Sequence, residues 1–213
     1  MFDLSGNKLY EFLITMAALI ICITVHEFAH AYSAYRAGDD TPKAQGRISL
    51  NPIDHLDPMG TIMMVVSTLG GFGIGWGKPV QVNPGNFRHP RWDDLRVSLW
   101  GPLSNLLTAA AVGTVIRFWG MHMTAPVYAF TETLVLISIV IALFNLIPIS
   151  PLDGSHIMAA LLPREQAIAY GRFMAQFGLL ILLGLIFVGG GLLGRVIEPP
   201  LSFLWWLFTG TPY

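Results

Sequence analysis

Long apolar stretches separated by short polar segments dominate the chain, and four of them are long enough to cross a membrane as helices. These stretches cover residues 12–35, 97–116, 133–151 and 174–193. Each is close to the ~20 residues that a membrane-spanning helix requires. The pattern therefore predicts an all-α polytopic membrane protein with about four transmembrane helices.

Shorter segments complete the predicted architecture. Residues 59–74 are apolar but rich in glycine, and we expect them to enter the membrane and return on the same side. Residues 46–50 and 78–82 alternate between apolar and polar side chains and predict short strands. Residues 201–208 (LSFLWWLF) are too short to span, and their paired tryptophans favour an interfacial C-terminal helix.

The composition supports a single membrane-embedded domain formed by residues 1–213. Hydrophobic residues make up 54% of the chain and charged residues 12%, against roughly 25% charged residues in an average soluble domain. The formal net charge of −1 and the lack of a long basic tract argue against a nucleic-acid partner. The N-terminal residues lack the basic region and cleavage site of a signal peptide, so we expect the first apolar stretch to be retained in a lipid bilayer.

The distribution of lysine and arginine predicts how the chain is oriented. If residues 59–74 return to the side from which they enter, nine of the 12 basic residues lie on one side, and Lys8, Arg117 and Arg195 lie on the other. Cytoplasmic loops carry an excess of these residues. We therefore expect the first side to face the cytoplasm of a bacterial or archaeal cell.

The first apolar stretch contains the motif His26-Glu27-Phe28-Ala29-His30, an HExxH. On a helix, residues four positions apart share a face, so both imidazoles can bind one metal ion. Glu27 then lies beside that ion, where it can take a proton from water. Catalytic zinc commonly has three protein ligands and an open position for a water whose pKa falls to about 7. The motif thus predicts a zinc site inside a membrane span.

Two other interpretations of the motif stay open at this point. Ionisable groups in a membrane cost roughly 2.5–3.5 kcal/mol each even on lenient scales. The three side chains could be retained as hydrogen-bonding groups between helices, or they could belong to a metal transporter or sensor that cleaves no peptide. Glu27 favours hydrolysis, because transport does not need an acid beside the metal that is not itself a ligand.

A third ligand is expected from Asp153. Residues 145–154 read NLIPISPLDG, and Pro148 and Pro151 cannot continue a helix. Irregular backbone at membrane depth is tolerated where it is buried in protein or lines a wet cavity. Because this break and the HExxH motif both fall towards the predicted cytoplasmic side, Asp153 can complete a His-His-Asp site. The alternative is a helix that ends in a proline-rich turn with a solvated aspartate.

Together, HEFAH and NLIPISPLDG resemble the paired motifs of the site-2 protease family of intramembrane zinc metalloproteases. The similarity extends to GRISLNPIDHLDPMG (46–60), GWGKPVQV (75–82) and GPLSN (101–105). The chain is too short to hold the PDZ or nucleotide-sensing domain of larger members, so it resembles the small group built of little beyond the catalytic core.

This resemblance implies roles for five residues. His26, His30 and Asp153 would bind one Zn2+ per chain, and Glu27 would be the general base. Asn145 would hold substrate or the developing oxyanion, with a hydrogen bond between helices as the alternative. The implied enzyme is a zinc-dependent endopeptidase that hydrolyses peptide bonds within or next to transmembrane segments of a membrane protein or peptide.

Other polar residues near the motifs have less specific interpretations. Cys22 lies one helical turn before His26, but Asp153 already completes a three-ligand pattern. For His55 we expect a position in a turn or at the interface, and for His156 a position near the site or at the interface. Asn105 predicts a hydrogen bond between helices.

Overall fold

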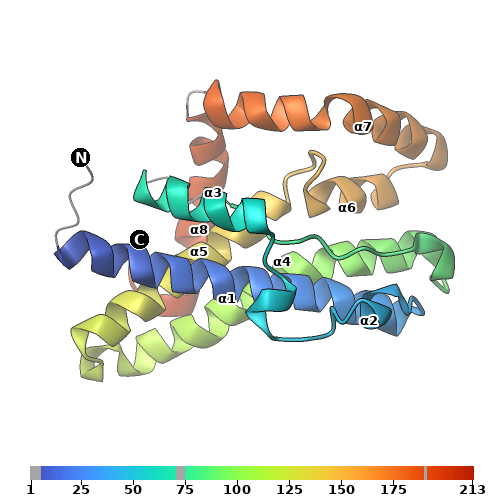
Figure 1. Cartoon of the computed structure of the whole chain (residues 1–213). Coiled ribbons are helices and arrows are strands. Elements are labelled where there is room, and N and C mark those ends of the chain that lie inside the picture. Colours follow the sequence, from blue (N-terminus) through green and yellow to red (C-terminus); the bar gives the residue numbers. More distant parts are fainter. Residues whose placement is uncertain (1–5, 71–74, 190) are drawn as a thin grey trace.

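The computed structural model describes residues 6–70, 75–189 and 191–213, and it is helical almost throughout (Figure 1). Four helices are long and apolar enough to cross a membrane. They are α1 (Gly6–Ala37), α4 (Pro90–Trp119), α5 (Ala125–Asn145) and α7 (Arg164–Phe187). The prediction of an all-α, multi-pass membrane protein with four spans is confirmed.

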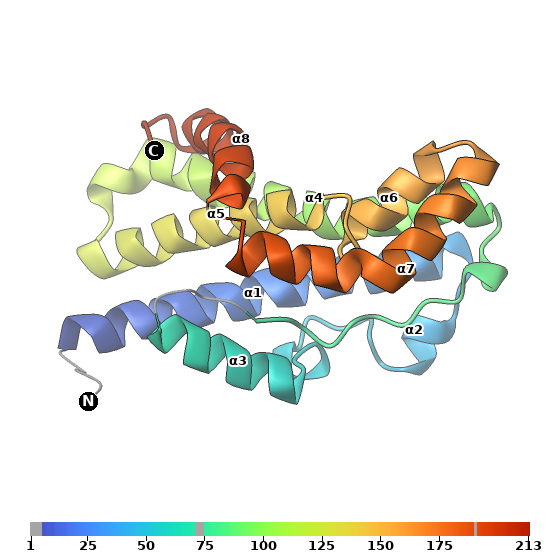
Figure 2. The same cartoon turned by 90° about the horizontal axis from the view of Figure 1, so that it is seen from above.

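The remaining elements connect or cover these spans. They are α2 (Thr41–Ala44), η1 (Pro52–Asp54), α3 (Pro58–Leu69), η2 (Pro84–Asn86), η3 (Gly120–His122), α6 (Asp153–Leu161) and α8 (Leu192–Thr209). The C-terminal end of α1 and the N-terminal ends of α4 and α7 lie at the same end of the molecule (Figure 2).

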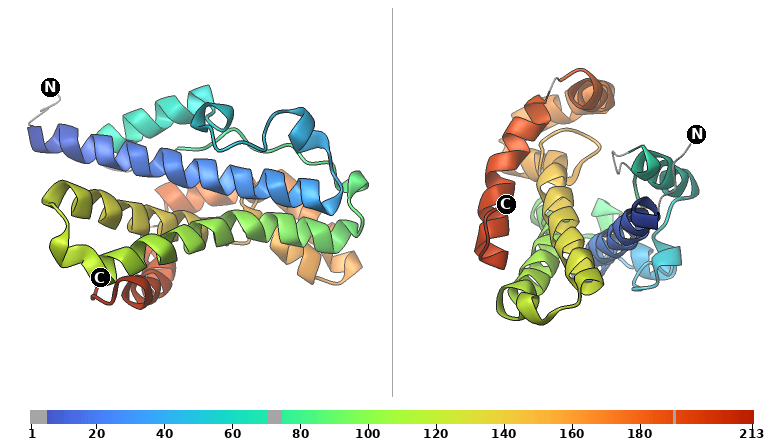
Figure 3. Two further views of the ribbon diagram at one scale, coloured as in Figure 1. Left: turned by 90° about the horizontal axis from the view of Figure 1, so that it is seen from below. Right: turned by 90° about the vertical axis from the view of Figure 1, so that its left-hand side faces the viewer.

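Helices α1, α4 and α5 pack against one another at the centre of the molecule (Figure 3). Between α4, α5 and α8 lies a buried cluster that includes Ile139 and Trp205. A second cluster joins α1 to α5 through the small side chains of Ala18 and Cys22. Small residues let membrane helices approach closely, so α1 packs tightly against α5, the helix that precedes Asp153 in the chain.

Most of the segment expected to re-enter the membrane, residues 59–69, lies in a helix, α3, which is beside α1. Neither residues 46–50 nor 78–82 form a strand, and one isolated β-bridge, Leu56 to Gly77, occurs in the described ranges. The prediction of a re-entrant β segment was therefore wrong. Residues 71–74, the end of that predicted segment, lie outside the described residues.

Local sequence explains why this segment is helical. Asp57 precedes α3 and accepts a hydrogen bond from the backbone N–H of Gly60 at 2.8 Å. Pro58 occupies the first helical position, where its missing N–H costs nothing. An aspartate cap followed by proline is a strong helix-start signal, and only Gly60 of the segment's glycines lies inside α3, because the helix ends at Leu69, before Gly70.

Helix α5 ends at Asn145, earlier than the predicted span, because Pro148 and Pro151 follow. Residues 146–152 form turns and include a cis peptide bond between Ser150 and Pro151. Helix α6 then begins at Asp153 and packs against α4. The proline-rich break therefore places Asp153 in the first turn of α6, a helix that packs against α4.

Helix α8 is longer than the predicted interfacial segment and continues through Pro199 and Pro200. Its residues Leu201 and Trp205 are buried against α4 and α5, whereas Trp206 is exposed. The C-terminal segment therefore closes one side of the bundle, and an interfacial position for its exposed face stays a prediction.

Candidate metal centre

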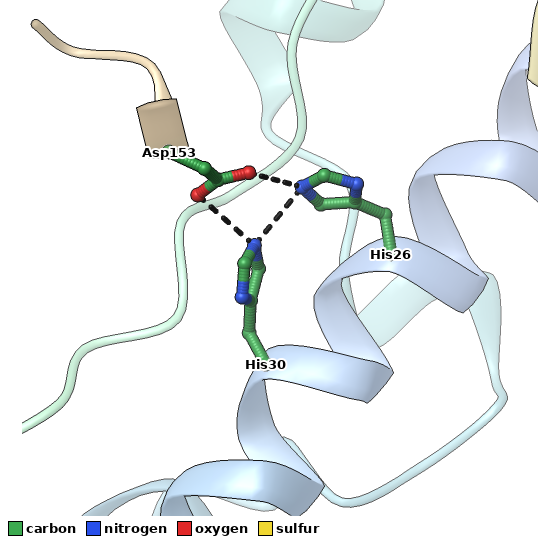
Figure 4. Close-up of side chains that lie close together, drawn as sticks. All are labelled: His26, His30 and Asp153. Carbon is green, nitrogen blue, oxygen red and sulfur yellow. Dashed lines mark hydrogen bonds and ion pairs between the residues drawn. The ribbon is translucent and has the colours of Figure 1, made fainter. Parts of the chain in front are cut away.

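Two histidines of α1 and one aspartate of α6 bring their side chains together (Figure 4). The Nε2 atoms of His26 and His30 lie 2.9 Å apart. Nε2 of His26 is 3.1 Å from Oδ2 of Asp153, and Nε2 of His30 is 3.2 Å from Oδ1. The structure thus unites the three residues that the sequence suggested as ligands.

The distances and the donor chemistry fit zinc. In a tetrahedral site with bonds of about 2.0–2.1 Å, two ligand atoms lie roughly 3.3 Å apart, close to the separations found here. Imidazole nitrogen and carboxylate oxygen are both common zinc ligands. Oδ2 of Asp153 is buried and has no hydrogen-bond partner within the part of the chain that the structure describes. A cation at this position would satisfy it.

Close packing at two glycines makes the cluster possible. A Cβ atom on Gly101 of α4 would lie 2.3 Å from Nε2 of His30 and 2.7 Å from Nε2 of His26. A Cβ atom on Gly154 would lie 2.4 Å from the carbonyl oxygens of Leu146 and Ile147. Gly101 therefore leaves the space that the imidazoles occupy, and Gly154 lets the turn fold tightly beside Asp153.

The ring of His30 is oriented by a backbone contact. Its Nδ1 lies 2.7 Å from the carbonyl oxygen of Val97 on α4. A carbonyl oxygen only accepts hydrogen bonds, so Nδ1 carries the hydrogen and donates it. In the neutral ring, Nε2 then keeps the lone pair that a metal needs.

The carboxyl group of Asp153 is suited to remain ionised. Burial alone would raise the pKa of Asp153, but without a metal the protonated imidazoles of His30 and His26 beside it act more strongly in the opposite direction. The pKa of Asp153 therefore lies well below its ordinary value, and the group offers an anionic oxygen to a cation at neutral pH.

Glu27 lies between the two histidines on α1 and is held by residues from two segments outside that helix. Its Oε2 accepts a hydrogen bond from the backbone N–H of Val80 at 3.0 Å and lies 3.8 Å from the guanidinium of Arg47. The buried Arg47 side chain also donates to the carbonyl oxygens of Asp54 and Lys78. These contacts fix the carboxylate beside the cluster but outside the set of ligand atoms.

Asn145 is the last residue of α5, directly before the turn that leads to Asp153. Its Nδ2 donates to the carbonyl oxygen of Ile141 in the same helix at 3.0 Å. The observed hydrogen bond is therefore within one helix and not between helices. The role in holding substrate remains a proposal.

Three other polar residues near the motifs form contacts outside the ligand cluster. Sγ of Cys22 lies 3.1 Å from Oγ of Ser138 on α5, and Cys22 does not belong to the ligand cluster found among the described residues. His55 is fully buried in a turn, with Nε2 2.6 Å from the carbonyl oxygen of Ser49. His156 is exposed on α6, and its hydrogen bond with Asp94 raises the pKa of His156.

Comparison with known proteins gives the family. The family model for peptidase family M50 matches residues 112–185. YwhC from Bacillus subtilis (strain 168), which carries a provisional zinc metalloprotease name, is 42% identical over 167 residues, covering 72% of this chain and 74% of YwhC. The chain belongs to peptidase family M50. Peptidase family M50 is the family of the site-2 proteases, so the resemblance seen in the sequence is confirmed.

Two further relatives match most of the chain. Rip2 from Mycolicibacterium smegmatis is 30% identical over 185 residues, covering 82% of this chain and 67% of Rip2. Rip2 from Mycobacterium tuberculosis (strain H37Rv) is 29% identical over 204 residues, covering 92% and 73%. Both carry provisional zinc metalloprotease names. No solved structure matches the chain.

Membership in this family decides between a protease and a metal transporter or sensor, the two classes of protein that the sequence left open. The protein is a zinc-dependent metalloprotease embedded in a membrane, and a transporter or sensor without peptidase activity is not supported. The matched region contains Asn145 and Asp153 but not the HExxH motif. The cluster of the two motifs in space is therefore an independent finding of the structure.

Several contacts around the cluster were not foreseen. Arg47 and Val80 hold Glu27, and Gly101 leaves space for both histidines. The hydrogen bond between helices that was predicted for Asn105 is observed, but its partner, His26, was not foreseen. All four lie in the segments GRISLNPIDHLDPMG, GWGKPVQV and GPLSN, whose similarity to the family was the available signal.

Proposed function

We propose that this zinc metalloprotease hydrolyses peptide bonds within or next to transmembrane segments of membrane proteins, for regulated intramembrane proteolysis or for clearance of membrane peptides. The observation that carries the proposal is the position of the ligand cluster. His26 and His30 lie inside α1, a helix long and apolar enough to span the membrane. A scissile bond must therefore come to the depth of that span to meet the site.

We assign the metal ligands to His26, His30 and Asp153. Zinc, when bound, supplies a Lewis acid that polarises a peptide carbonyl and makes a nearby water more acidic. The two imidazoles and the carboxylate hold the ion from two helices, α1 and α6. Three protein ligands leave one tetrahedral position open for reaction.

We assign the acid–base role to Glu27. Its carboxylate takes a proton from the attacking water and later gives it to the nitrogen of the leaving amine, so that one water is consumed and an acid and an amine are formed. The N–H of Val80 orients one oxygen of this carboxylate. Asn145, at the end of α5, is assigned to hold the substrate carbonyl as negative charge develops on it.

The substrate must be locally extended at the cleaved bond. In a helix, each peptide carbonyl accepts an intrahelical hydrogen bond and is shielded by neighbouring side chains. Substrates whose membrane segment contains glycine or proline near one end will open there more easily.

The proposed orientation places the site towards the cytoplasm. Most of the basic residues flank three helix ends that lie together at one end of the molecule (Figure 2). These are the C-terminal end of α1 and the N-terminal ends of α4 and α7. The positive-inside rule supports a cytoplasmic position for that end. Water and the released fragment would then exchange with the cytoplasm.

A reconstituted cleavage assay tests the function. We expect the full chain in liposomes to cut a single-span peptide with a Gly-Pro pair near its cytoplasmic end, and mass spectrometry to place the cut within or beside the apolar segment. A matched peptide with Leu-Leu in place of Gly-Pro should be cut more slowly, roughly tenfold for each 1.4 kcal/mol of added helix stability. Equal cleavage of both peptides would contradict the need for local unwinding, and cleavage confined to soluble flanking residues would contradict the proposed function.

A further inference from the structure

Asn105 is a buried residue of α4 with one unsatisfied polar atom. The residue is 0% exposed. Its Nδ2 lies 3.2 Å from Nδ1 of His26, and its Oδ1 has no hydrogen-bond partner among the described residues. A buried amide oxygen without a partner is costly, because it has lost its hydrogen bonds to water.

Metal binding by His26 determines what Nδ1 can do. The cluster contains Nε2 of His26, so this atom must offer its lone pair to the metal. The hydrogen of the neutral ring then sits on Nδ1, which becomes a donor. An amide nitrogen at 3.2 Å would place a second donor against it, which is unfavourable.

Turning the amide by half a rotation removes this conflict. The oxygen and nitrogen of an asparagine amide have nearly the same shape, and the hydrogen-bond network decides which way the group points. In the turned orientation, Oδ1 of Asn105 faces Nδ1–H of His26 and accepts its hydrogen. The oxygen that lacked a partner gains one.

We propose that Asn105 is a positioning residue of the metal centre, whose side-chain oxygen accepts a hydrogen bond from Nδ1–H of His26. The contact fixes the tautomer and the ring plane of His26, as the carbonyl oxygen of Val97 does for His30. The inference rests on the proposed assignment of His26 as a ligand.

A single face of α4 then supports both imidazoles. Val97, Gly101 and Asn105 follow one another at intervals of four residues and share that face. The carbonyl oxygen of Val97 orients His30, Gly101 leaves space for both rings, and Asn105 orients His26. Outer partners of this kind raise the basicity of a ligand and reduce its freedom to turn away from the metal.

Two substitutions distinguish a hydrogen-bonding role of Asn105 towards His26 from a purely space-filling role. Asn105→Leu keeps the number and branching of the side-chain heavy atoms but removes the acceptor. Asn105→Asp keeps an acceptor oxygen and creates a carboxylate–histidine pair, which is common behind zinc-bound histidines. Thr108→Val, one turn along α4, is the matched control, because its hydroxyl donates to the carbonyl oxygen of Ser104 in the same helix.

The measurement is zinc affinity of the full chain in detergent, by competition with a chromophoric chelator, together with the visible absorption spectrum of the cobalt-loaded protein. We expect Asn105→Leu to weaken zinc binding roughly 10- to 100-fold and to change the cobalt spectrum. Asn105→Asp and Thr108→Val should stay within a few-fold of the unsubstituted protein. Thermal unfolding of each variant reports on folding separately.

Three results would overturn the inference. Unchanged zinc affinity and cobalt spectrum in folded Asn105→Leu would show that His26 needs no acceptor from Asn105. Equal weakening in folded Asn105→Leu and Asn105→Asp would mean that the amide nitrogen, and not the oxygen, is required. Absence of zinc binding in the unsubstituted protein would instead remove the proposed metal centre itself, so the two failures are distinguishable.

Discussion

Replacing Glu27 with glutamine is expected to abolish peptide hydrolysis and leave zinc bound. Glutamine has nearly the same shape as glutamate and can still accept a hydrogen bond from the N–H of Val80. It cannot accept a proton from water, and general acid–base catalysis is typically worth about 10²- to 10⁴-fold in rate. We therefore expect the rate of single-span peptide cleavage in liposomes to fall by about 10³-fold or more, with unchanged zinc content.

The control for this prediction is Glu165→Gln, which removes a carboxylate from the exposed first turn of α7. This variant should cleave at the normal rate. Cleavage by Glu27→Gln at a rate within a few-fold of the unsubstituted protein would exclude Glu27 as the base. Loss of zinc from Glu27→Gln would instead make this residue part of the ligand set.

Replacing Gly101 with alanine should remove zinc binding without unfolding the protein. The added Cβ atom would lie 2.3 Å from Nε2 of His30 and 2.7 Å from Nε2 of His26, far inside van der Waals contact. The atoms that it meets are the tips of two side chains, which can swing aside while the helices stay in place. We expect zinc affinity, measured by chelator competition, to fall at least about 100-fold, since both ligand nitrogens are displaced.

Gly184→Ala on α7 provides the comparison, because a Cβ atom there meets no other atom within 4 Å. It should bind zinc normally and be as stable as the unsubstituted protein, or slightly more stable. If Gly101→Ala bound zinc as tightly as Gly184→Ala, the two imidazoles would not occupy the space beside α4 when the metal is present.

Features that depend on local sequence could be predicted. The four spans follow from length and apolarity, and residues four apart on a helix put His26 and His30 on one face. The proline-rich turn before Asp153 was also readable, because Pro148 and Pro151 end a helix regardless of its surroundings. The pairing of Asp153 with the two histidines was expected because the proline-rich break and the HExxH motif fall towards the same predicted side, and the family resemblance implied the same ligands.

Features that depend on contacts between distant segments could not be predicted. Residues 78–82 alternate like a strand, yet the chain there is extended without a strand partner, and Val80 donates to a side chain instead. Asn105 looked like a general polar contact between helices, and only the packing of α1 against α4 brings it to His26. Residues 58–69 form helix α3, which begins at the cap formed by Asp57 and ends before Gly70.

The most direct test of the metal centre is the zinc content of the purified full chain and of its Asp153→Ala variant. Asp94→Ala is the matched control, because Asp94 pairs with His156 and does not belong to the ligand cluster. We expect about one zinc per chain in the unsubstituted protein and in Asp94→Ala, as a three-ligand site implies, and strongly reduced zinc in Asp153→Ala. Equal zinc in all three proteins would contradict a site shared by α1 and α6, and no zinc in the folded, unchelated protein would contradict the metal centre altogether.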